Sequence, residues 1–348
     1  MNIYQYRNNF KKIANVDCEL LYGSTDGMCE PMLSIIITLY KRREYFMEAV
    51  HSAVQQKDID FEYEIIIICD DPEGSCDISD LEDIKNVYFY RNSKNIGLYN
   101  SCNMGAKISR GRYISFLHDD DLLYPNYLSE VYEFIISNDP HTECILVNRD
   151  IIGNNSKKNI IKEIAKNVIK VLFFHLYFIR LFLRKSYKMI TLKEGLKYQL
   201  SNIYKAPSCG AFFEKRIFIE SGGFNQEFWP VSDYFFFLRF NRDHKIYMLR
   251  KRLACYRWFD NLSQNKEIQF SSLDMLTNFF KSRQPVESVE RYFNFFRNEL
   301  VYVKYLMISE SFCDEIKHRY PEIAKVNKIR WIIFKIYNIS LRFFHDII

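Results

Sequence analysis

Glycine-rich motifs that bind nucleotides are missing from this chain of 348 residues. No GxGxxG follows its first strongly apolar segment, and no GxxxxGK[ST] occurs anywhere. These absences argue against a dinucleotide site of the usual kind and against a P-loop. Any phosphate that binds here is therefore expected to be neutralised by a metal ion and not cradled by a glycine loop.

The chain also lacks a disulfide framework, a membrane-spanning segment and a strong net charge. Its nine cysteines include no CxxC pair and no Cys/His ligand spacing, which favours reduced thiols over a disulfide scaffold or a zinc site. No apolar run approaches the roughly 20 residues needed to span a bilayer, and no signal-peptide segment begins the sequence. The formal net charge of +5 is too small to indicate nucleic acid. We expect a cytoplasmic protein without a nucleic-acid partner.

What the chain has in excess is aromatic side chains. Hydrophobic residues make up 48% of the sequence and aromatic residues 17%. A chain of this length can bury a sizeable core in one large domain or two smaller ones. These aromatic side chains are therefore expected in the core, in stacking contacts with a ligand or at a membrane interface.

Strands and helices alternate from residue 32 onward. β-branched runs at Leu33–Thr38 and Tyr63–Cys69 predict buried parallel strands, and apolar residues at helical spacing predict a helix over Glu44–Gln56. The elements expected after these are a strand at Val87–Arg91, a helix at Asn100–Ser109 and a strand that begins at Tyr113. This order is typical of an open α/β sheet, which binds ligands at the carboxyl ends of its strands.

Three consecutive carboxylates, Asp119, Asp120 and Asp121, follow the last of these strands. Adjacent carboxylates repel one another unless they are solvated, protonated or bridged by a cation. A hard cation such as Mg or Mn takes oxygen ligands and often shares its coordination sphere with substrate phosphates. The alternative is a solvated acidic turn that caps the next helix. Taken alone, the cluster is compatible with both interpretations.

Several motifs together resemble the family 2 glycosyltransferases. The first four, in chain order, are Ser34–Tyr40 (SIIITLY), Ile68–Asp71 (ICDD), Asn95–Gly97 with Asn103, and Phe116–Asp121 (FLHDDD). Two later ones are Gly222–Phe224 followed by Ser232–Asp233, and Tyr256–Arg257 with Asn261–Ser263. Their order and spacing are more specific than any single motif. The resemblance covers residues 32–265 and implies the α/β GT-A fold, an open, mostly parallel twisted sheet flanked by helices, with a nucleotide-diphosphate sugar as donor.

The resemblance implies a nucleobase site at two strand ends. Thr38 and Tyr40 would border the base, and the Tyr40 ring would offer a stacking face. Asp71 would accept a hydrogen bond from a uracil imide, with Asp70 beside it. For Thr38 and Tyr40 the alternative is ordinary packing at a strand end.

A second donor contact is implied at the turn before the expected helix Asn100–Ser109. Asn95 and Gly97 would form the loop beneath the sugar-nucleotide, and Asn103 belongs to the same donor-binding motif. The alternative for Asn95 and Gly97 is a plain turn.

By the same resemblance, the carboxylate cluster would be the family's metal motif. Asp120 is the first choice as ligand of Mn or Mg, which would clamp the two phosphates and stabilise the departing diphosphate. Asp119 is the second choice and would also lie next to the sugar and ribose. His118 occupies the first acidic position of the usual Asp-x-Asp pattern. Either Asp119 takes over the duties of that carboxylate, or His118 itself faces the nucleotide.

Most family members invert the anomeric centre in one displacement, which needs a carboxylate to take the proton of the acceptor hydroxyl. Asp233 is the candidate base, although Ser232 replaces the Glu that usually precedes it. The alternative is that Asp233 only caps the predicted helix Tyr234–Phe240. Arg257 would contact the diphosphate, or else be a surface charge at a helix end.

Two segments outside the resemblance combine basic and apolar side chains. Basic residues recur every fourth position in the insertion, at Lys162, Lys166, Lys170 and again at Arg180, Arg184, Lys188. The C-terminus repeats this pattern after Pro321. Such helices suit an anionic membrane surface, although packing on the sheet or on a partner subunit is the alternative.

The sequence therefore predicts five segments: an N-terminal extension (1–31), a donor-binding half (32–153), a basic amphipathic helical insertion (154–190), an acceptor-side half (191–268) and a C-terminal helical region (269–348). The leading interpretation is an inverting glycosyltransferase of the hexosyltransferase type. It would transfer sugar from a UDP-sugar or related donor to a glycan or lipid-linked acceptor in cell-surface polysaccharide synthesis, peripherally on the inner face of the membrane. The alternatives are a nucleotidyltransferase and a non-catalytic GT-A scaffold at the membrane surface. The sugar, the linkage and the oligomeric state, a homo-oligomer included, stay open.

Overall fold

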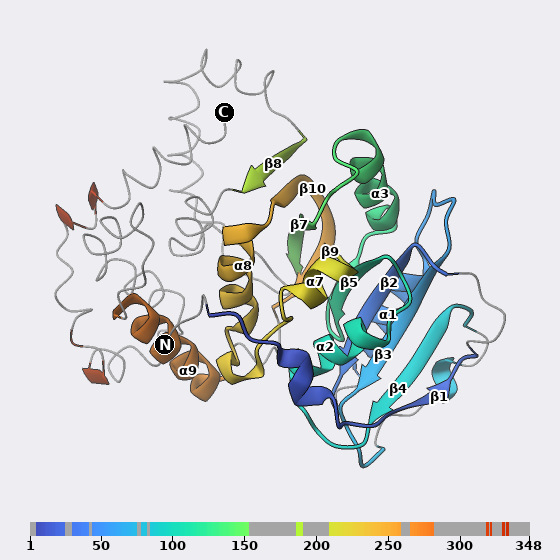
Figure 1. Cartoon of the computed structure of the whole chain (residues 1–348), viewed down its shortest axis with the longest axis horizontal. Helices are drawn as coiled ribbons and strands as arrows, with labels where there is room; N and C mark the ends of the chain where they lie inside the picture. Colours follow the sequence, from blue (N-terminus) through green and yellow to red (C-terminus); the bar gives the residue numbers. More distant parts are fainter. Residues whose placement is uncertain are drawn as a thin grey trace.

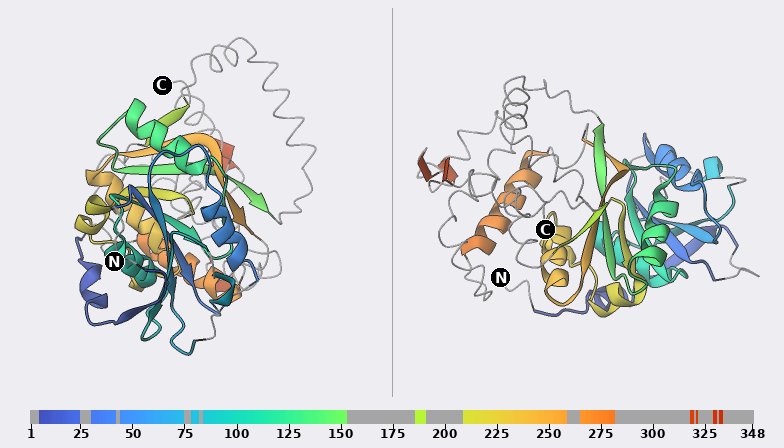
Figure 2. Two further views of the ribbon diagram at one scale, coloured as in Figure 1. Left: turned by 90° about the vertical axis from the view of Figure 1, so that its right-hand side faces the viewer. Right: turned by 90° about the horizontal axis from the view of Figure 1, so that it is seen from above.

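One mixed sheet runs through the described part of the protein, with helices on both of its faces (Figures 1 and 2). The computed structural model describes residues 5–24, 30–41, 44–74, 78–81, 84–152, 186–190, 209–258 and 265–281, with a few single residues between 318 and 333. Within these ranges the strand order is β1-β4-β3-β2-β5-β9-β7-β10-β6, and β8 also pairs with β10. This is the open α/β architecture that the sequence predicts, and four of the nine strand pairings in these ranges are parallel.

The donor half of the sheet is parallel. Its strands are β2 (Leu33–Leu39), β3 (Tyr63–Cys69), β4 (Val87–Asn92) and β5 (Tyr113–His118). β2 pairs with β3 and with β5, and β3 pairs with β4, all in parallel. Every residue of β2 is buried, as expected for a strand covered on both faces.

The other half of the sheet is mixed. Its strands are β6 (Leu122–Leu123), β7 (Cys144–Ile152), β8 (Tyr187–Ile190), β9 (Ala211–Glu214) and β10 (Ile246–Arg257). β7 and β10 are parallel, whereas β9 lies antiparallel between β5 and β7. β9 therefore joins the two halves into one sheet.

Helices cover the two faces with different sets of side chains. The helices are α1 (Phe46–Val54), α2 (Leu98–Ile108), α3 (Tyr127–Ser137), α7 (Lys215–Glu220), α8 (Ser232–Asp243) and α9 (Lys266–Lys281). α1 and α3 pack with Ile35 and Ile37 of β2, whereas α2, α7 and α8 pack with Ile36. This alternation is the period of two that a strand imposes on its side chains.

Much of the aromatic excess lies in one cluster on the α8 face. Phe116, Phe213, Phe218, Phe224 and Phe236 are all nearly or fully buried, and their ring centroids lie 4.8–6.0 Å apart in successive pairs. Buried aromatic rings remove large apolar areas from water and prefer such tilted or edge-to-face pairs. The cluster fixes α8 against β5 and β9, and so fixes the segment that contains Asp233.

The N-terminal extension packs on the domain and adds a strand that the sequence did not indicate. β1 (Cys18–Tyr22) pairs antiparallel with β4. The short 3₁₀ helix η1 (Asn9–Ile13) packs against α2, with Ile13 and Met104 buried together.

The insertion and the C-terminal region lie mostly outside the described residues. The described end of the insertion corrects one expectation, because Lys188 lies in β8, a strand antiparallel to β10, and not on a helix. At the other boundary, α9 confirms a helix as far as Lys281. Among the described residues, no helix is both long and apolar enough to cross a membrane.

Candidate active site

The carboxyl ends of β2, β3 and β5 bring several predicted residues to one edge of the sheet. Thr38 lies in register with Ile68 on one side and with His118 on the other. Asp70 follows directly after β3. Because these strands are parallel, residues that are far apart in sequence come together, as expected for an α/β ligand site.

Asp70 binds the turn that precedes α2. Its Oδ1 accepts hydrogen bonds from Asn92 Nδ2 and the Ile96 N–H, both at 2.9 Å, and its Oδ2 accepts one from the Gly97 N–H at 2.7 Å. Burial raises the pKa of Asp70, although these hydrogen bonds act to lower it. Both oxygens are therefore engaged in holding the donor loop, which gives Asp70 a structural role beside its predicted site.

The loop that Asp70 holds contains the predicted residues Asn95 and Gly97. Gly97 has φ of +84°, and a Cβ there would lie 2.4 Å from the Gln226 side chain, so a glycine is required at this close approach. Asn95 is exposed at the tip of the turn. The turn is thus a fixed surface at the strand edge and not a loose connection.

The predicted nucleobase residues differ in their exposure to solvent. Tyr40 is 48% exposed, whereas Thr38 and Asp71 are buried. Asp71 Oδ1 accepts a hydrogen bond from the Glu73 N–H at 3.2 Å. The Lys41 ammonium lies 5.5 Å from the centre of the Tyr40 ring, which places a positive charge beside the exposed aromatic face.

The acidic cluster is not a solvated turn. Asp120 and Asp121 are buried, and His118 and Asp119 are half-buried. Asp121 Oδ1 accepts a hydrogen bond from the Arg257 N–H at 2.9 Å, and burial raises the pKa of Asp121 to about 6. Among the described residues, no three His, Cys, Asp or Glu side chains converge into a complete metal site.

Arg257 is a structural clamp at this cluster and not the surface charge considered from the sequence. It is buried at the end of β10. Its Nε donates to the Asp120 carbonyl at 2.9 Å and its Nη2 to Glu48 at 2.7 Å, and the guanidinium stacks 3.8 Å from the Tyr45 ring centre. The guanidinium that was predicted to contact the diphosphate therefore makes hydrogen bonds to groups of the protein itself.

Asp233 lies within the first turn of α8 and is not its N-cap, because that position is Val231. Its Oδ1 accepts hydrogen bonds from the Tyr234 N–H at 2.8 Å and from the Tyr99 hydroxyl at 3.1 Å. Burial raises the pKa of Asp233, while Tyr99, His118 and Arg149 act to lower it. Asp233 is therefore not the N-cap residue of α8, although its side chain accepts the N–H of Tyr234 in the first turn.

Arg149 is a cation of this region that the sequence analysis missed. It lies on β7 in register with Ala254, and its guanidinium stacks 4.3 Å from the Tyr256 ring centre. Its charge lowers the pKa of both Asp121 and Asp233. A signal was available, because Asn148-Arg149-Asp150 directly follows the apolar run Cys144–Val147.

Asn103 corrects the predicted set of donor-binding residues. It is fully buried. Its Nδ2 donates to the Phe224 carbonyl at 2.8 Å, and its Oδ1 accepts from the Phe224 N–H at 2.9 Å. Both ends of the amide are therefore used inside the protein. Asn103 joins α2 to the acceptor-side segment and is not placed to contact a donor.

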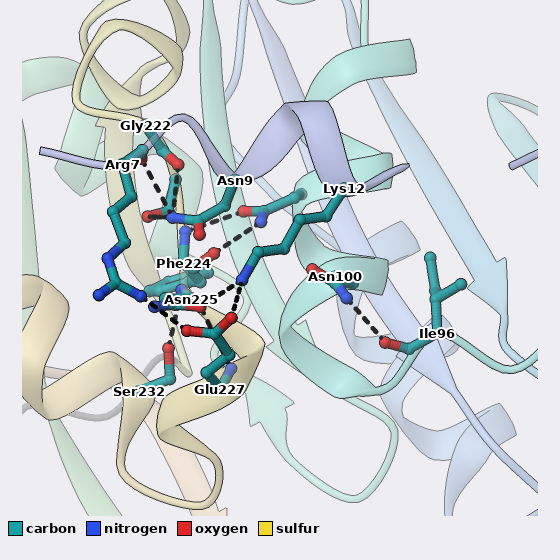
Figure 3. Close-up of polar contacts among 12 residues, drawn as sticks. Arg7, Asn9, Lys12, Ile96, Asn100, Gly222, Phe224, Asn225, Glu227 and Ser232 are labelled. Carbon is teal, nitrogen blue, oxygen red and sulfur yellow. Dashed lines mark hydrogen bonds and ion pairs between the residues drawn. The ribbon is translucent and has the colours of Figure 1, made fainter. Parts of the chain in front are cut away.

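The N-terminal extension holds the same acceptor-side segment from the other side (Figure 3). Asn9 is fully buried, and both its backbone N–H and its Nδ2 donate to the Gly222 carbonyl, at 3.1 and 2.9 Å. Nearby, Lys12 Nζ contacts Asn225 Oδ1 at 3.1 Å and Glu227 at 2.8 Å. Gly222 admits this contact because a Cβ there would lie 2.1 Å from the Arg7 carbonyl.

The parallel donor half, the acidic strand ends and the carboxylate at the start of α8 define a GT-A type protein. Residues 34–221 match the family model of glycosyl transferase family 2, and the chain belongs to this family. The predicted fold class and family are thereby confirmed.

Known relatives agree with this assignment. Uncharacterized glycosyltransferases from Haemophilus influenzae and Methanocaldococcus jannaschii are both 28% identical, over 138 and 116 residues, covering 36% and 32% of this chain. One from Rickettsia typhi is 32% identical over 129 residues, or 36% of this chain. The alignments span 42%, 39% and 39% of these relatives, less than half of their length.

A solved structure also has this fold. The crystal structure of S. aureus TarS 1-349 in complex with UDP-GlcNAc matches with a TM-score of 0.57 at 14% identity. The match covers 87% of this chain and 79% of that one. At this identity the likeness shows the fold alone.

Proposed function

We propose that the protein is an inverting glycosyltransferase that uses a UDP-sugar or a related nucleotide sugar. Membership of glycosyl transferase family 2 supports the reaction class, and the UDP-GlcNAc complex of TarS supports the donor class. The observation that favours it most directly is that Tyr99, in the first turn of α2, donates its hydroxyl to Asp233 Oδ1 at 3.1 Å, while Gly97, just before α2, donates its N–H to Asp70 at 2.7 Å. The acidic strand end and the candidate base are therefore joined through the start of α2.

In this proposal Asp233 is the general base. The acceptor hydroxyl oxygen attacks the anomeric carbon and gives its proton to Asp233, while the bond from that carbon to the diphosphate oxygen breaks and its electron pair leaves with the diphosphate. Burial raises the pKa of Asp233, and a carboxylate with a raised pKa accepts a proton more readily near neutral pH. One displacement on the face opposite the leaving group inverts the anomeric centre.

We further propose that Asp120 and Asp119 hold Mn or Mg, which would stabilise negative charge on the departing diphosphate. The carboxylate donors suit a hard cation. Such ions are often bound by one or two carboxylates together with substrate phosphates, so a complete protein cage is not required. Arg149 is a better placed cation for this region than Arg257, since its buried Nε has no hydrogen-bond partner in the described part of the chain.

The donor side of the proposal keeps Thr38, Tyr40 and Asp71 at the nucleobase and the turn of Asn95 and Gly97 under the sugar-nucleotide. The acceptor would be a glycan or a lipid-linked glycan of a cell-surface polysaccharide. The basic amphipathic segments would hold the protein at the inner face of an anionic membrane. These segments lie mostly outside the described residues, and Lys188 belongs to β8. The sequence pattern of the remaining basic and apolar residues supports this part.

A panel of nucleotide sugars tests the donor class first. With Mn present, the correct donor should raise the melting temperature, because a ligand that binds only the folded state stabilises it. Release of UDP should then require both this donor and a lipid-linked acceptor. Donor binding without turnover on any acceptor offered would favour the non-catalytic scaffold, and pyrophosphate release from a nucleoside triphosphate would favour a nucleotidyltransferase.

A further inference from the structure

The donor loop and the acceptor-side segment meet at the first turn of α2. Gly97, just before α2, donates its N–H to Asp70. Two residues later, the Tyr99 N–H donates to Gln226 Oε1 at 2.9 Å, and Gln226 begins the 3₁₀ helix η3 (Gln226–Phe228) that leads to Asp233. A side chain in this turn of α2 therefore lies between the donor loop and the segment that leads to Asp233.

The Tyr99 side chain is buried, with its hydroxyl at Asp233. The residue is 4% exposed, and its ring packs against Phe224 with 5.5 Å between centroids. The hydroxyl oxygen lies 3.1 Å from Asp233 Oδ1 and also 3.1 Å from the Pro230 carbonyl oxygen. Both neighbours are acceptors when Asp233 is ionised, whereas the hydroxyl has a single hydrogen to donate.

We propose that Tyr99 is a positioning residue for Asp233, whose hydroxyl donates to Oδ1 while the carboxylate is ionised and to the Pro230 carbonyl once Asp233 has taken up a proton. The inference rests on the proposed function, in which that proton comes from the acceptor hydroxyl. No covalent bond changes at Tyr99, because its hydrogen only rotates about the C–O bond. Among the described residues no hydrogen bond reaches Asp233 Oδ2, so Tyr99 and the Tyr234 N–H orient the carboxylate through its other oxygen.

The direction of the expected pH effect follows from the groups of the described residues that face Asp233. Burial raises the pKa of Asp233, and the Tyr99 hydroxyl, the Tyr234 N–H, His118 of β5 and Arg149 of β7 lower it. Cys102 of α2 also lies within electrostatic reach. Removal of the Tyr99 hydroxyl takes away one group that favours the ionised form. The pKa of Asp233 should then rise further.

The test is a titration of the Asp233 carboxyl carbon by ¹³C NMR in protein labelled at aspartate, with the signal assigned through Asp233→Asn. In Tyr99→Phe, which keeps the buried ring, the titration midpoint should move up by about one pH unit. Tyr99→3-fluorotyrosine keeps the ring and makes the hydroxyl a stronger donor, so the midpoint should move down. An unchanged midpoint in both variants would overturn the proposal. This titration needs no turnover.

Kinetics separates this proposal from the proposed function. In Tyr99→Phe, the low-pH limb of the kcat/KM profile should shift to higher pH together with the NMR midpoint. At pH values below this limb, activity should fall by up to about tenfold. The KM for the donor should not change. Tyr63→Phe is the matched control. The Tyr63 hydroxyl also donates to a backbone carbonyl, that of Val54, but Tyr63 lies at the end of β3 that is away from the site. If Asp233→Asn retains turnover, the base assignment fails. If only Asp233→Asn has an effect, the Tyr99 proposal alone fails.

Discussion

Asp70 and Asp233 are carboxylates that both contact the N-terminal end of α2, but their oxygens have different numbers of hydrogen-bond partners. Burial raises the pKa of both. Within the described part of the chain, Asp70 accepts three hydrogen bonds distributed over both oxygens, whereas Asp233 accepts two, both on Oδ1. A carboxylate whose two oxygens both accept hydrogen bonds from the protein stabilises the fold. A carboxylate with one oxygen that accepts no such hydrogen bond can take up a proton from a substrate.

The largest expected effect is on turnover at Asp233. Asp233→Asn should lower kcat by a factor of about 10² to 10⁴, because a neutral amide cannot take the acceptor proton. Donor affinity, measured by calorimetry, should change little. Asp243→Asn is the matched control, since Asp243 is an exposed residue at the other end of α8 that pairs with Arg242. Normal turnover in Asp233→Asn would contradict the base assignment.

The second expected effect concerns the contact that joins the two sides. Asn103→Ala should lower the free energy of unfolding by about 3 kcal/mol, because the buried N–H and carbonyl of Phe224 both lose their partner. Denaturant unfolding measures this change. Asn100→Ala, on the same helix, removes one half-buried hydrogen bond to the Ile96 carbonyl and should lower it by less than about 1 kcal/mol. Equal losses in the two variants would contradict the structural role of Asn103.

The pH dependence of stability tests the Asp70 side of the comparison. A raised pKa means that the folded state binds the proton more tightly than the unfolded chain, so this contribution to stability is present below the ordinary pKa of 3.8 and is lost as pH rises through the folded value. Relative to Asp70→Asn, the wild-type protein should therefore become less stable as pH rises through this window.

Asp243 provides a control of opposite sign. Its pKa is lowered, mainly by the Arg242 side chain, so its contribution is present above 3.8 and is lost as pH falls through the folded value. Denaturant unfolding of wild type, Asp70→Asn and Asp243→Asn over pH 3 to 7 gives both slopes. Slopes of the same sign would contradict the assigned environments.

The smallest expected effect is at the exposed edge of the N-terminal contact. Glu227 pairs with Arg7 and Lys12 at 2.7 and 2.8 Å, yet its side chain is 56% exposed. Glu227→Gln should change the free energy of unfolding by less than about 1 kcal/mol, and less still at high salt. Asn9→Ala, in the buried part of the same contact, should have the larger effect.

The sequence by itself was sufficient for the parallel half of the fold. The β-branched runs of β2 and β3 and the helical spacing of α1 are local patterns whose period is set by the backbone. Strand ends could also be located, and the rule that parallel strands bind ligands at their carboxyl ends brought Thr38, Asp70 and Asp120 to one edge. These predictions depend only on the identity and spacing of a few consecutive residues.

Only the tertiary structure decided what each polar side chain at this edge contacts. Asn103 and Arg257 belong to motif segments, yet their partners, Phe224 and Glu48, are 121 and 209 positions away in the chain. Tyr99 and Arg149 carried no motif, and their relation to Asp233 arises from the packing of α2, β7 and α8. A buried polar group must find a partner wherever the fold supplies one. Sequence spacing does not contain that information, so the contacts of Asn103, Arg257 and Tyr99 were visible only in the structure.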